Sequence, residues 1–357
     1  SRRLAPERVA PLPPAGVFRR ARGARLGGPE LDPLSQIALL EQISAADPSA
    51  GWCAMIGSDG GYATAYLDEA VARAMYPSLD LPTALNANPS GRAEEVEGGY
   101  LLNGRWAFGS GSTHSAWLFL HAFVVDGGGA MRTAPGGLPD MRILAVAGAD
   151  AEIIDTWDTT GLAGSGSHDI AVHDVFVPGE RTYSLLDGEP VDPSPLYRQR
   201  WMFFVNIAAV PLGLGRAALD EAKGIALAKV AMGSLTTAAE DPIVDIAVAR
   251  AEALVGSARA FLHETVGEVW TEVQRGGDVR VPWSRFRAAT THAFHATKEA
   301  VGLLYEALGT SGIYRRSPLD RYYRDIATMA QHVLSQPKTW IPAGRGLLGL
   351  DPQALAF

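Results

Sequence analysis

The sequence predicts an α+β protein made of three consecutive parts: a helical region at 1–80, a small antiparallel β-barrel or sandwich at 81–190, and a four-helix bundle at 195–357. Two observations predict this order. Apolar residues recur every three or four positions at both ends of the chain, as they do on one face of an α-helix. Between the ends, Gly, Pro, Asn and Asp separate short β-rich runs.

The first part is expected to hold three helical stretches. One begins at Pro33, because Ile37 and Leu40 fall on the same face. The others are expected over 45–56 and over 62–75. The first residues of the chain read as the end of a helix, so we expect that a short N-terminal piece is missing.

The strands expected in the second part are 100–106, 117–125, 142–146, 153–157 and 170–177. The helices expected in the third part are 201–226 with Pro211 inside, 242–270, 284–308, and one from Pro318 to about Ser335. Asp241 and Pro242 form a favourable helix start, with an N-cap acid followed by proline at the first helical position.

Charge and composition argue against nucleic-acid binding, membrane insertion and disulfide formation. The net charge of -8 and the pI near 5.5 argue against nucleic acid as a partner. No apolar run approaches the ~18 residues of a membrane span, so we expect no membrane insertion. A single cysteine, Cys53, allows no internal disulfide, and the cytoplasm is the expected compartment.

Common catalytic and cofactor motifs are missing from the sequence. There is no GxSxG, P-loop or HExxH pattern. The run GLAGSG at 161–166 precedes a strand, which argues against a dinucleotide-binding turn. His292 and His295 share a helix without further metal ligands, so we interpret them as ordinary bundle histidines.

The segment 104–117 (GRWAFGSGSTHSAW) combines the aromatic residues Trp106 and Phe108 with glycines and small hydroxyl residues. A flat aromatic ligand needs aromatic flanks, open backbone N–H groups and a hydroxyl for a ring nitrogen. A tight β-turn with packed aromatic side chains has the same composition. The residues alone leave both interpretations open.

The segment 318–335 (PLDRYYRDIATMAQHVLS) carries ionisable groups. Arg324 and Asp325 would by default form a buried ion pair. On a continuous helix, His332 lies two turns after Asp325 and therefore on the same face.

Together these stretches resemble the acyl-CoA dehydrogenase superfamily over essentially the whole chain. Four segments resemble its flavin-dependent monooxygenase branch: AADPSAGW (45–52), GGYLLNGRWAFGSGSTHSAW (98–117), DTWDTTGLAGSGSHDIAVHDVFVP (155–178) and PLDRYYRDIATMAQHV (318–333). The resemblance implies a flavin enzyme with a reduced FMN or FAD supplied by a separate flavin reductase. It also implies a homo-oligomer, either a tetramer or a dimer.

The resemblance assigns roles to individual residues. Ser110 would meet the N5/O4 edge of the flavin and Phe108 would flank its ring. The other cofactor-binding positions that it implies are Gly109, Gly111, Asn86 in the loop 86–91, and Gly309 and Thr310 toward a neighbouring subunit.

The last helix separates the two branches of the superfamily. Many acyl-CoA dehydrogenases carry a catalytic Glu where this chain has His332. Without a placed carboxylate, removal of an α-proton is disfavoured. The implied reaction is hydroxylation or N- or S-oxygenation of a small, cyclic substrate through a C4a-hydroperoxide. His332 would act as a base toward the substrate or as a proton donor toward oxygen.

Other positions depart from the family or stay open. Aromatic hydroxylases of this branch often carry a His where this chain has Ser58-Asp59-Gly60-Gly61. The glycines suggest a roomier or differently shaped pocket. Tyr62 is expected to form a substrate-binding wall of that pocket. His114 is expected to serve packing. His168 either faces the flavin or stabilises a turn.

Two alternatives accompany this interpretation. The first is a dehydrogenase-like flavin oxidoreductase with a relocated base, for which Glu264 and Glu268 are the candidates. The second is a flavin-less binding protein of the same fold.

Overall fold

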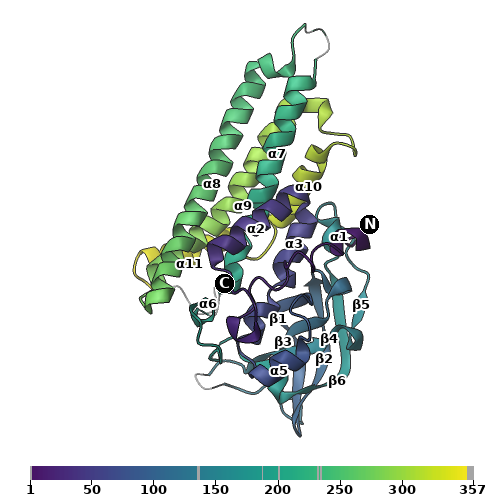
Figure 1. Cartoon of the computed structure of the whole chain (residues 1–357), viewed down its shortest axis with the longest axis vertical. Helices are drawn as coiled ribbons and strands as arrows, with labels where there is room; N and C mark the ends of the chain where they lie inside the picture. The colour runs from purple at the N-terminus through teal and green to yellow at the C-terminus, as the bar shows by residue number, and fades with distance from the viewer. Residues whose placement is uncertain are drawn as a thin grey trace. The chain divides into compact units, whose positions relative to one another are not determined.

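The computed structural model describes residues 2–134, 137–186, 188–199, 202–230, 233 and 235–351. The described chain separates into two compact units. The sheet unit comprises Ser1–Asp32, Trp52–Asp158 and Ala163–Phe203, and the helical unit comprises Pro33–Gly51, Thr159–Leu162 and Phe204–Phe357. Figure 1 labels most of their helices and strands.

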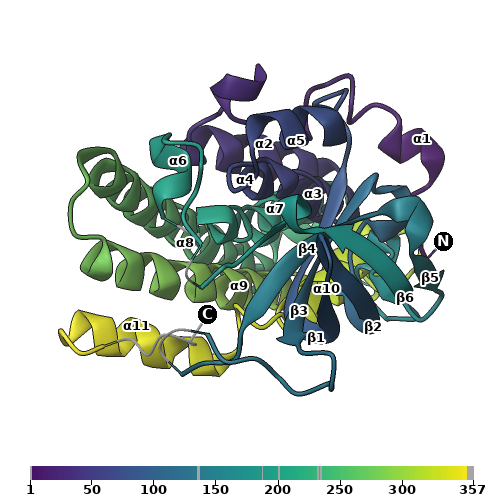
Figure 2. The ribbon, with the colours of Figure 1, turned by 90° about the horizontal axis from the view of Figure 1, so that it is seen from below.

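The sheet unit is built on one mixed sheet, and in the described chain its strand order is β5-β6-β2-β1-β3-β4-β7. The strands are β1 (Thr83–Val96), β2 (Gly99–Gly109), β3 (Trp117–Val125), β4 (Met141–Ala147), β5 (Glu152–Ile154), β6 (His168–Pro178) and β7 (Thr182–Tyr183). Figure 2 shows β1, β2, β3 and β6 fanned side by side. The sheet is open, with β5 and β7 at its edges, and does not close into a barrel.

One pair departs from the predicted antiparallel arrangement, because β1 and β3 run parallel. The reason is local. β1 and β2 form a hairpin around Gly98, which has a positive φ of 80°. The chain then leaves β2 at the end where β1 begins and returns on the other side of β1, so β3 must run in the same direction as β1.

Trp106 is fully buried at the centre of the sheet's apolar core. Its indole Nε1 donates to the carbonyl of His121 at 2.7 Å. A Cβ added at Gly91 would lie 2.1 Å from the Trp106 ring, and one at Gly104 would lie 2.8 Å from it. Both glycines are therefore needed to make room for the buried indole. Trp106 is thus a packing residue and not part of a ligand-binding wall.

The predicted β elements differ from the structure in several places. The segment 86–91 is not a loop, because it lies within β1, where the register against β3 shifts between Asn86 and Gly91. The predicted strand 153–157 ends at Ile154, since only Glu152–Ile154 pairs with β6. β1 and β7 had no counterpart in the prediction.

Short helices complete the sheet unit. They are α1 (Pro6–Val9), α4 (Gly60–Thr64), α5 (Glu69–Met75), α6 (Pro195–Arg198) and the part of α3 (Pro48–Gly57) from Trp52 onward. The single predicted stretch 62–75 is thus divided into α4 and α5.

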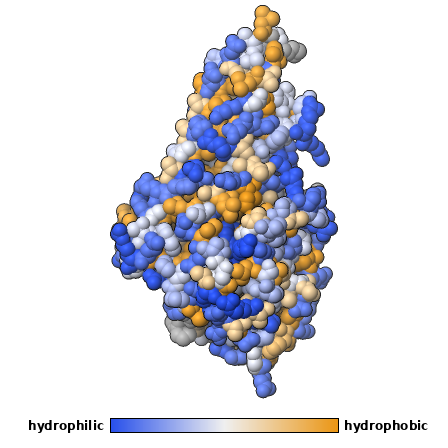
Figure 3. All heavy atoms as spheres, viewed as in Figure 1, coloured by the Kyte–Doolittle hydropathy of each residue, from blue (hydrophilic) through white to orange (hydrophobic). Residues whose placement is uncertain are grey.

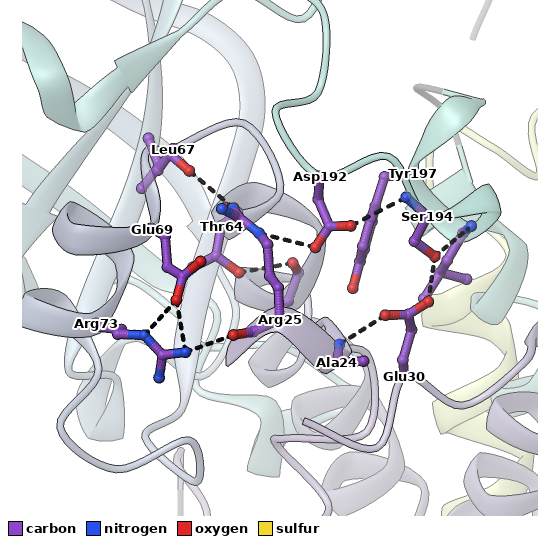
Figure 4. A network of polar contacts seen from close by, with 12 residues as sticks. Ala24, Arg25, Glu30, Thr64, Leu67, Glu69, Arg73, Asp192, Ser194 and Tyr197 are labelled. Carbon is purple, nitrogen blue, oxygen red and sulfur yellow. Dashed lines mark hydrogen bonds and ion pairs between the residues drawn. The ribbon is translucent and has the colours of Figure 1, made fainter. Parts of the chain in front are cut away.

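A polar network joins the N-terminal segment to distant parts of the sheet unit (Figure 4). Arg25 donates to the Asp192 carboxylate at 2.9 Å and to the carbonyls of Thr64 and Leu67 at 2.8 and 2.9 Å. Glu30 accepts from Ala24 N at 2.7 Å and is bonded to the Ser194 hydroxyl. Because Arg25 and Asp192 are mostly buried, this network holds the chain around α4 in place.

The helical unit consists of α2 (Pro33–Ala46), α7 (Ala209–Ala228), α8 (Pro242–Arg275), α9 (Arg280–Leu308), α10 (Pro318–Met329) and α11 (Trp340–Leu347). The helix starts at Pro33 and Pro242 are confirmed, and Asp241 caps α8 by accepting from Ile243 N at 2.9 Å. α9 packs against α7, α8, α10 and α11, so it forms the centre of the bundle.

Two predicted helices were too long. Of the stretch 201–226, Trp201 lies outside the described residues, Met202–Asn206 is a 3₁₀ turn, and α7 begins only at Ala209. Pro211 thereby falls in the first turn of α7, where a missing N–H costs no hydrogen bond. The last predicted helix ends at Met329 rather than near Ser335.

The segment Met202–Ala228 is long and apolar enough to cross a membrane by composition, but 89% of its most apolar window is buried within the protein. This is the pattern of a core helix. On the face shown in Figure 3, apolar and polar side chains are interspersed over the surface.

Candidate functional site

The turn that ends β2 combines backbone strain with an exposed aromatic ring. Phe108 has a positive φ of 66°, which bulky L-residues rarely adopt. Its side chain is 71% exposed and meets the sheet unit through an edge-on contact with Trp157, with 6.2 Å between ring centroids. Strain at an exposed aromatic residue is typical of ligand-binding positions rather than of packing.

Ser110, two residues later, belongs to a chain of buried hydroxyl groups. Its Oγ accepts from Trp52 Nε1 at 3.0 Å and lies 2.7 Å from Ser167 Oγ. Ser167 Oγ is in turn 2.7 Å from Ser165 Oγ. If Ser167 donates to Ser110, both acceptor sites of Ser110 are used and its own proton is available to a ligand.

The predicted neighbours of Ser110 hold this turn in shape. Asn86 donates to Ala107 O at 2.6 Å and accepts from Asn88 N at 3.1 Å, so its amide ties β1 to the end of β2. Gly111 has a φ of 73°, and its N–H bonds to Ser165 O at 3.0 Å. A Cβ at Gly109 would lie 2.7 Å from the Ile170 side chain. Their roles toward a flavin stay predictions.

Two histidines border the turn. Burial lowers the pKa of His114 to about 4, so its ring is neutral at physiological pH. His168 is buried, and its Nδ1 lies 3.1 Å from Trp157 N and 3.2 Å from the Asp155 carboxylate. His168 also borders an open hollow of about 420 Å³ together with Arg2, Arg3 and Thr113.

The expected extra room beside Tyr62 is not present. A Cβ at Gly61 would lie 2.4 Å from Ala21 O, and one at Gly60 would lie 2.6 Å from the Thr83 side chain. The glycines are therefore needed for close packing. Tyr62 lines a hollow with only about 10 Å³ of free volume, enough for a single water molecule.

In the helical unit, α10 is clamped by the segment 159–162. A Cβ at Gly161 would lie 2.0 Å from Arg324 O, and the Asp325 carboxylate accepts from Leu162 N at 2.6 Å. Burial raises the pKa of Asp325 to about 6. The predicted Arg324–Asp325 pair is wrong, because adjacent helical residues point in different directions. Arg324 instead bonds to Asp320 at 2.6 Å and to Thr160 O at 2.6 Å.

His332 lies in a turn after α10, so the prediction that it shares a helical face with Asp325 was wrong. Its N–H bonds to Met329 O at 3.0 Å, and its carbonyl accepts from the Ser335 hydroxyl at 2.9 Å. The Ser335 hydroxyl and the following Pro337 favour a turn over another helical turn.

The chemical state of His332 follows from its surroundings. Burial lowers its pKa to about 4, so the imidazole is neutral near pH 7. Nδ1 accepts from Leu334 N at 3.3 Å, which assigns the ring proton to Nε2. A neutral ring of this tautomer donates a hydrogen bond from Nε2–H and is a weak base.

The remaining candidate residues lie elsewhere in the helical unit. Gly309 ends α9 with a φ of 54°, and Gly309 and Thr310 are both exposed. Glu264 and Glu268 both pair with Arg285, the former at 2.7 Å. Both carboxylates are thus engaged by the same arginine, so the relocated-base alternative gains no support here.

Sequence reasoning missed Trp52, Ser165 and Ser167 as parts of the hydroxyl chain. Trp52 lies 58 positions from Ser110, and its hydrogen-bonding is not visible in any local pattern. The signal that was available is compositional: a serine follows each of two glycines in Gly164–Ser167.

Comparisons with known proteins agree with this geometry. Residues 205–337 match the family model described as the C-terminal domain of acyl-CoA dehydrogenase. The chain is 36% identical over 341 residues to an indole-3-acetate monooxygenase of Pseudomonas putida, covering 94% of this chain and 85% of that protein. It is 26% identical to the oxygenase component of an FADH₂-dependent resorcinol hydroxylase of Rhizobium, covering 99% of this chain and 90% of that protein.

Solved structures show the same fold. The crystal structure of the HsaA monooxygenase from M. tuberculosis superposes with a TM-score of 0.87 at 25% identity, covering 99% of this chain and 92% of that one. XiaF from Streptomyces, solved with FADH₂ and glycerol, gives a TM-score of 0.88 at 23% identity, with 100% and 91% coverage.

Proposed function

Because the chain belongs to the family of flavin-dependent, two-component monooxygenases with the acyl-CoA dehydrogenase fold, we propose that it oxygenates a small aromatic substrate with reduced FMN or FAD and O₂. The observation that carries the proposal is Phe108, an exposed aromatic ring on a strained backbone beside the Ser110 hydroxyl. A flat ring stacked on Phe108 would bury that apolar surface.

The residues of this turn fit a flavin. Phe108 would flank the isoalloxazine, and Ser110 would hold its N5/O4 edge through a hydroxyl that Trp52 and Ser167 keep in position. Reduced flavin supplies the electrons with which one oxygen atom of O₂ is transferred to the substrate and the other is released as water. The chain itself supplies position, hydrogen bonds and exclusion of water.

His332 is proposed as the catalytic side chain on the substrate side. Of its two possible roles, the donor role is favoured, because Nδ1 already accepts from Leu334 N and burial disfavours the protonated ring. Nε2–H would donate a hydrogen bond to the reacting oxygen or to a substrate heteroatom. Tyr62 would form part of the aromatic wall once a substrate opens the hollow beside it.

The partners follow from the family. Relatives whose names specify an oxygenase component or subunit imply a separate reductase, which supplies the reduced flavin. We propose a tetramer or dimer in which the exposed Gly309–Thr310 turn approaches the cofactor of a neighbouring subunit. Light scattering on the purified protein tests this assembly, and a monomer would contradict it.

The function is tested by supplying reduced FMN or reduced FAD from a general flavin reductase and following oxygenated products by mass spectrometry. Indole-3-acetate and resorcinol are the first substrates, since relatives are named for acting on them. We expect one atom of ¹⁸O from ¹⁸O₂ in the product. The proposal would be contradicted if the protein bound neither FMN nor FAD, or if an acyl-CoA bleached the bound oxidised flavin.

A further inference from the structure

A buried arginine near the start of α9, the central helix of the bundle, has no hydrogen-bond or ion-pair partner within the described chain. Arg287 lies on α9 and is 9% exposed. Its Nη2 is enclosed and has no hydrogen-bond partner among the described residues, and no carboxylate of the described chain pairs with the guanidinium. Burial lowers the pKa of Arg287 to about 10, so the group is still charged at neutral pH. An uncompensated buried charge is costly.

The other deeply buried arginines show what a structural role requires in this protein. Arg20 donates to the carbonyls of Val17, Ala54 and Met55 and to the Ser58 hydroxyl. Arg22 donates to the carbonyls of Gly60 and Leu81 and stacks 3.5 Å over the Tyr76 ring. Each guanidinium is thus held by backbone acceptors, whereas Arg287 is held by none in the described residues.

A hydroxyl group next to Arg287 is also left without a partner. Thr290, three residues further along α9, is buried, and its Oγ1 has no hydrogen-bond partner in the part of the chain that the structure describes. Residues three apart are neighbours on a helix surface. By contrast, Thr291 on the adjoining face is satisfied, because its Oγ1 lies 2.6 Å from Thr339 Oγ1.

The occupant that these two groups fit is an oxyanion. A guanidinium binds a carboxylate or phosphate through two parallel N–H···O bonds, and a neighbouring hydroxyl adds a third. A water molecule would satisfy hydrogen bonds but would leave the charge uncompensated. A ligand group that compensates it would carry negative charge.

We propose that Arg287 and Thr290 form an oxyanion-binding point for the ligand of this enzyme, which takes the carboxylate of an aromatic acid substrate or the phosphate of the flavin. The inference rests on the proposed function and deepens it, because it names the charged group by which the ligand is recognised. It makes Arg287 a binding residue rather than a packing residue.

Ligand binding to the purified oxygenase tests the proposal without turnover. Dissociation constants are measured by calorimetry for two matched pairs of probes: indole-3-acetate against its uncharged amide, and FMN against riboflavin. The variant is Arg287→Met, which keeps an unbranched, flexible side chain but removes the guanidinium and its charge. The matched control is Lys298→Met, an exposed cation on the same helix.

We expect Arg287→Met to raise the Kd of one charged probe roughly 30-fold and to change that of its neutral partner less than about 3-fold. Loss confined to indole-3-acetate identifies the substrate carboxylate, and loss confined to FMN identifies the flavin phosphate. Equal effects on charged and neutral probes, or no effect on any probe, overturn the proposal.

A second pair of variants covers the case in which Arg287→Met does not fold. Arg287→Lys keeps the charge but loses the two-point geometry, and Thr290→Val removes only the hydroxyl. Each should weaken the charged probe about 3- to 10-fold, and unchanged affinity in both overturns the proposal. Turnover of the uncharged amide by the unmodified enzyme tests the oxygenase function separately, so either claim can fail alone.

Discussion

The two candidate turns, one in each unit of the chain, are built in opposite ways. The turn at Phe108–Gly111 is strained and exposes its aromatic ring, and its hydroxyl is fixed by Trp52 and Ser167 from distant parts of the sequence. The turn after α10 has no residue of positive φ and carries a half-buried histidine, and local bonds among Met329, His332 and Ser335 fix it.

This difference suggests that the first turn serves ligand binding and the second turn serves the reaction step. An exposed, strained aromatic residue gains stability only when a ligand covers it, so the first turn is suited to binding. A half-buried, neutral imidazole with a fixed tautomer is suited to the reaction step, because its proton is held at one atom. Substitutions in the first turn should therefore change flavin affinity, and substitutions in the second turn should change kcat.

The largest expected effect is on turnover. Replacing His332 by alanine should lower kcat about 10³-fold, because the hydrogen-bond donor at Nε2 is lost. Binding of reduced flavin should change less than about 3-fold. Single-turnover kinetics with preformed reduced flavin separate the two quantities.

His332→Gln sharpens this result. Glutamine keeps an N–H donor near the position of Nε2 but has no basic nitrogen. If the donor role is right, His332→Gln should retain about 10-fold more activity than His332→Ala. Equal loss in both variants would instead favour a general base.

The next effect concerns the packing of Gly161 against α10, the helix that precedes the His332 turn. In Gly161→Ala, the new Cβ would lie 2.0 Å from the Arg324 carbonyl, which as helix backbone cannot move aside. We expect a loss of roughly 3 kcal/mol in the free energy of unfolding, measured in urea. Gly224→Ala on α7 is the control, since nothing lies within 4 Å of its Cβ and a gain of about 0.5–1 kcal/mol is expected.

A third effect concerns pH at the first turn. The pKa of His114 is about 4 in the folded protein and 6.5 in the unfolded chain, so the unfolded chain takes up the proton first on acidification. The stability is complete above pH 6.5 and is lost as the pH falls toward 4, by up to about 3 kcal/mol. Asp325 opposes this trend, because its pKa is raised to about 6.

His114→Gln should flatten the dependence of Tm on pH between 6.5 and 4. His173→Gln, at an exposed histidine on β6, should leave that dependence unchanged. An identical pH profile for the unmodified protein and His114→Gln would contradict a buried neutral ring.

The smallest expected effect tests the strain at Phe108. Phe108→Gly removes the cost of a positive φ, and little apolar burial is lost because the ring is 71% exposed. The free energy of unfolding should stay the same or rise by up to about 1 kcal/mol. Flavin affinity should fall at the same time, and a variant that loses stability but not affinity would make Phe108 a packing residue.

The sequence alone determined the order of structure and most elements of the bundle. The helix starts at Pro33 and Pro242 were predictable because proline and capping residues act through neighbouring backbone groups. Strand β3 was predicted from end to end, since its apolar run is bounded by turn residues on both sides. The resemblance in the four motif segments also identified the flavin monooxygenase family.

Only the tertiary structure decided how these elements serve the site. It assigned Trp106 to the core and left Phe108 exposed, although the two have the same local composition around them. It ended α10 before His332, and it showed that Gly60 and Gly61 allow close packing rather than a wider pocket. These outcomes depend on contacts between residues far apart in the chain, such as Gly61 with Ala21 and Trp52 with Ser110, which no local periodicity encodes.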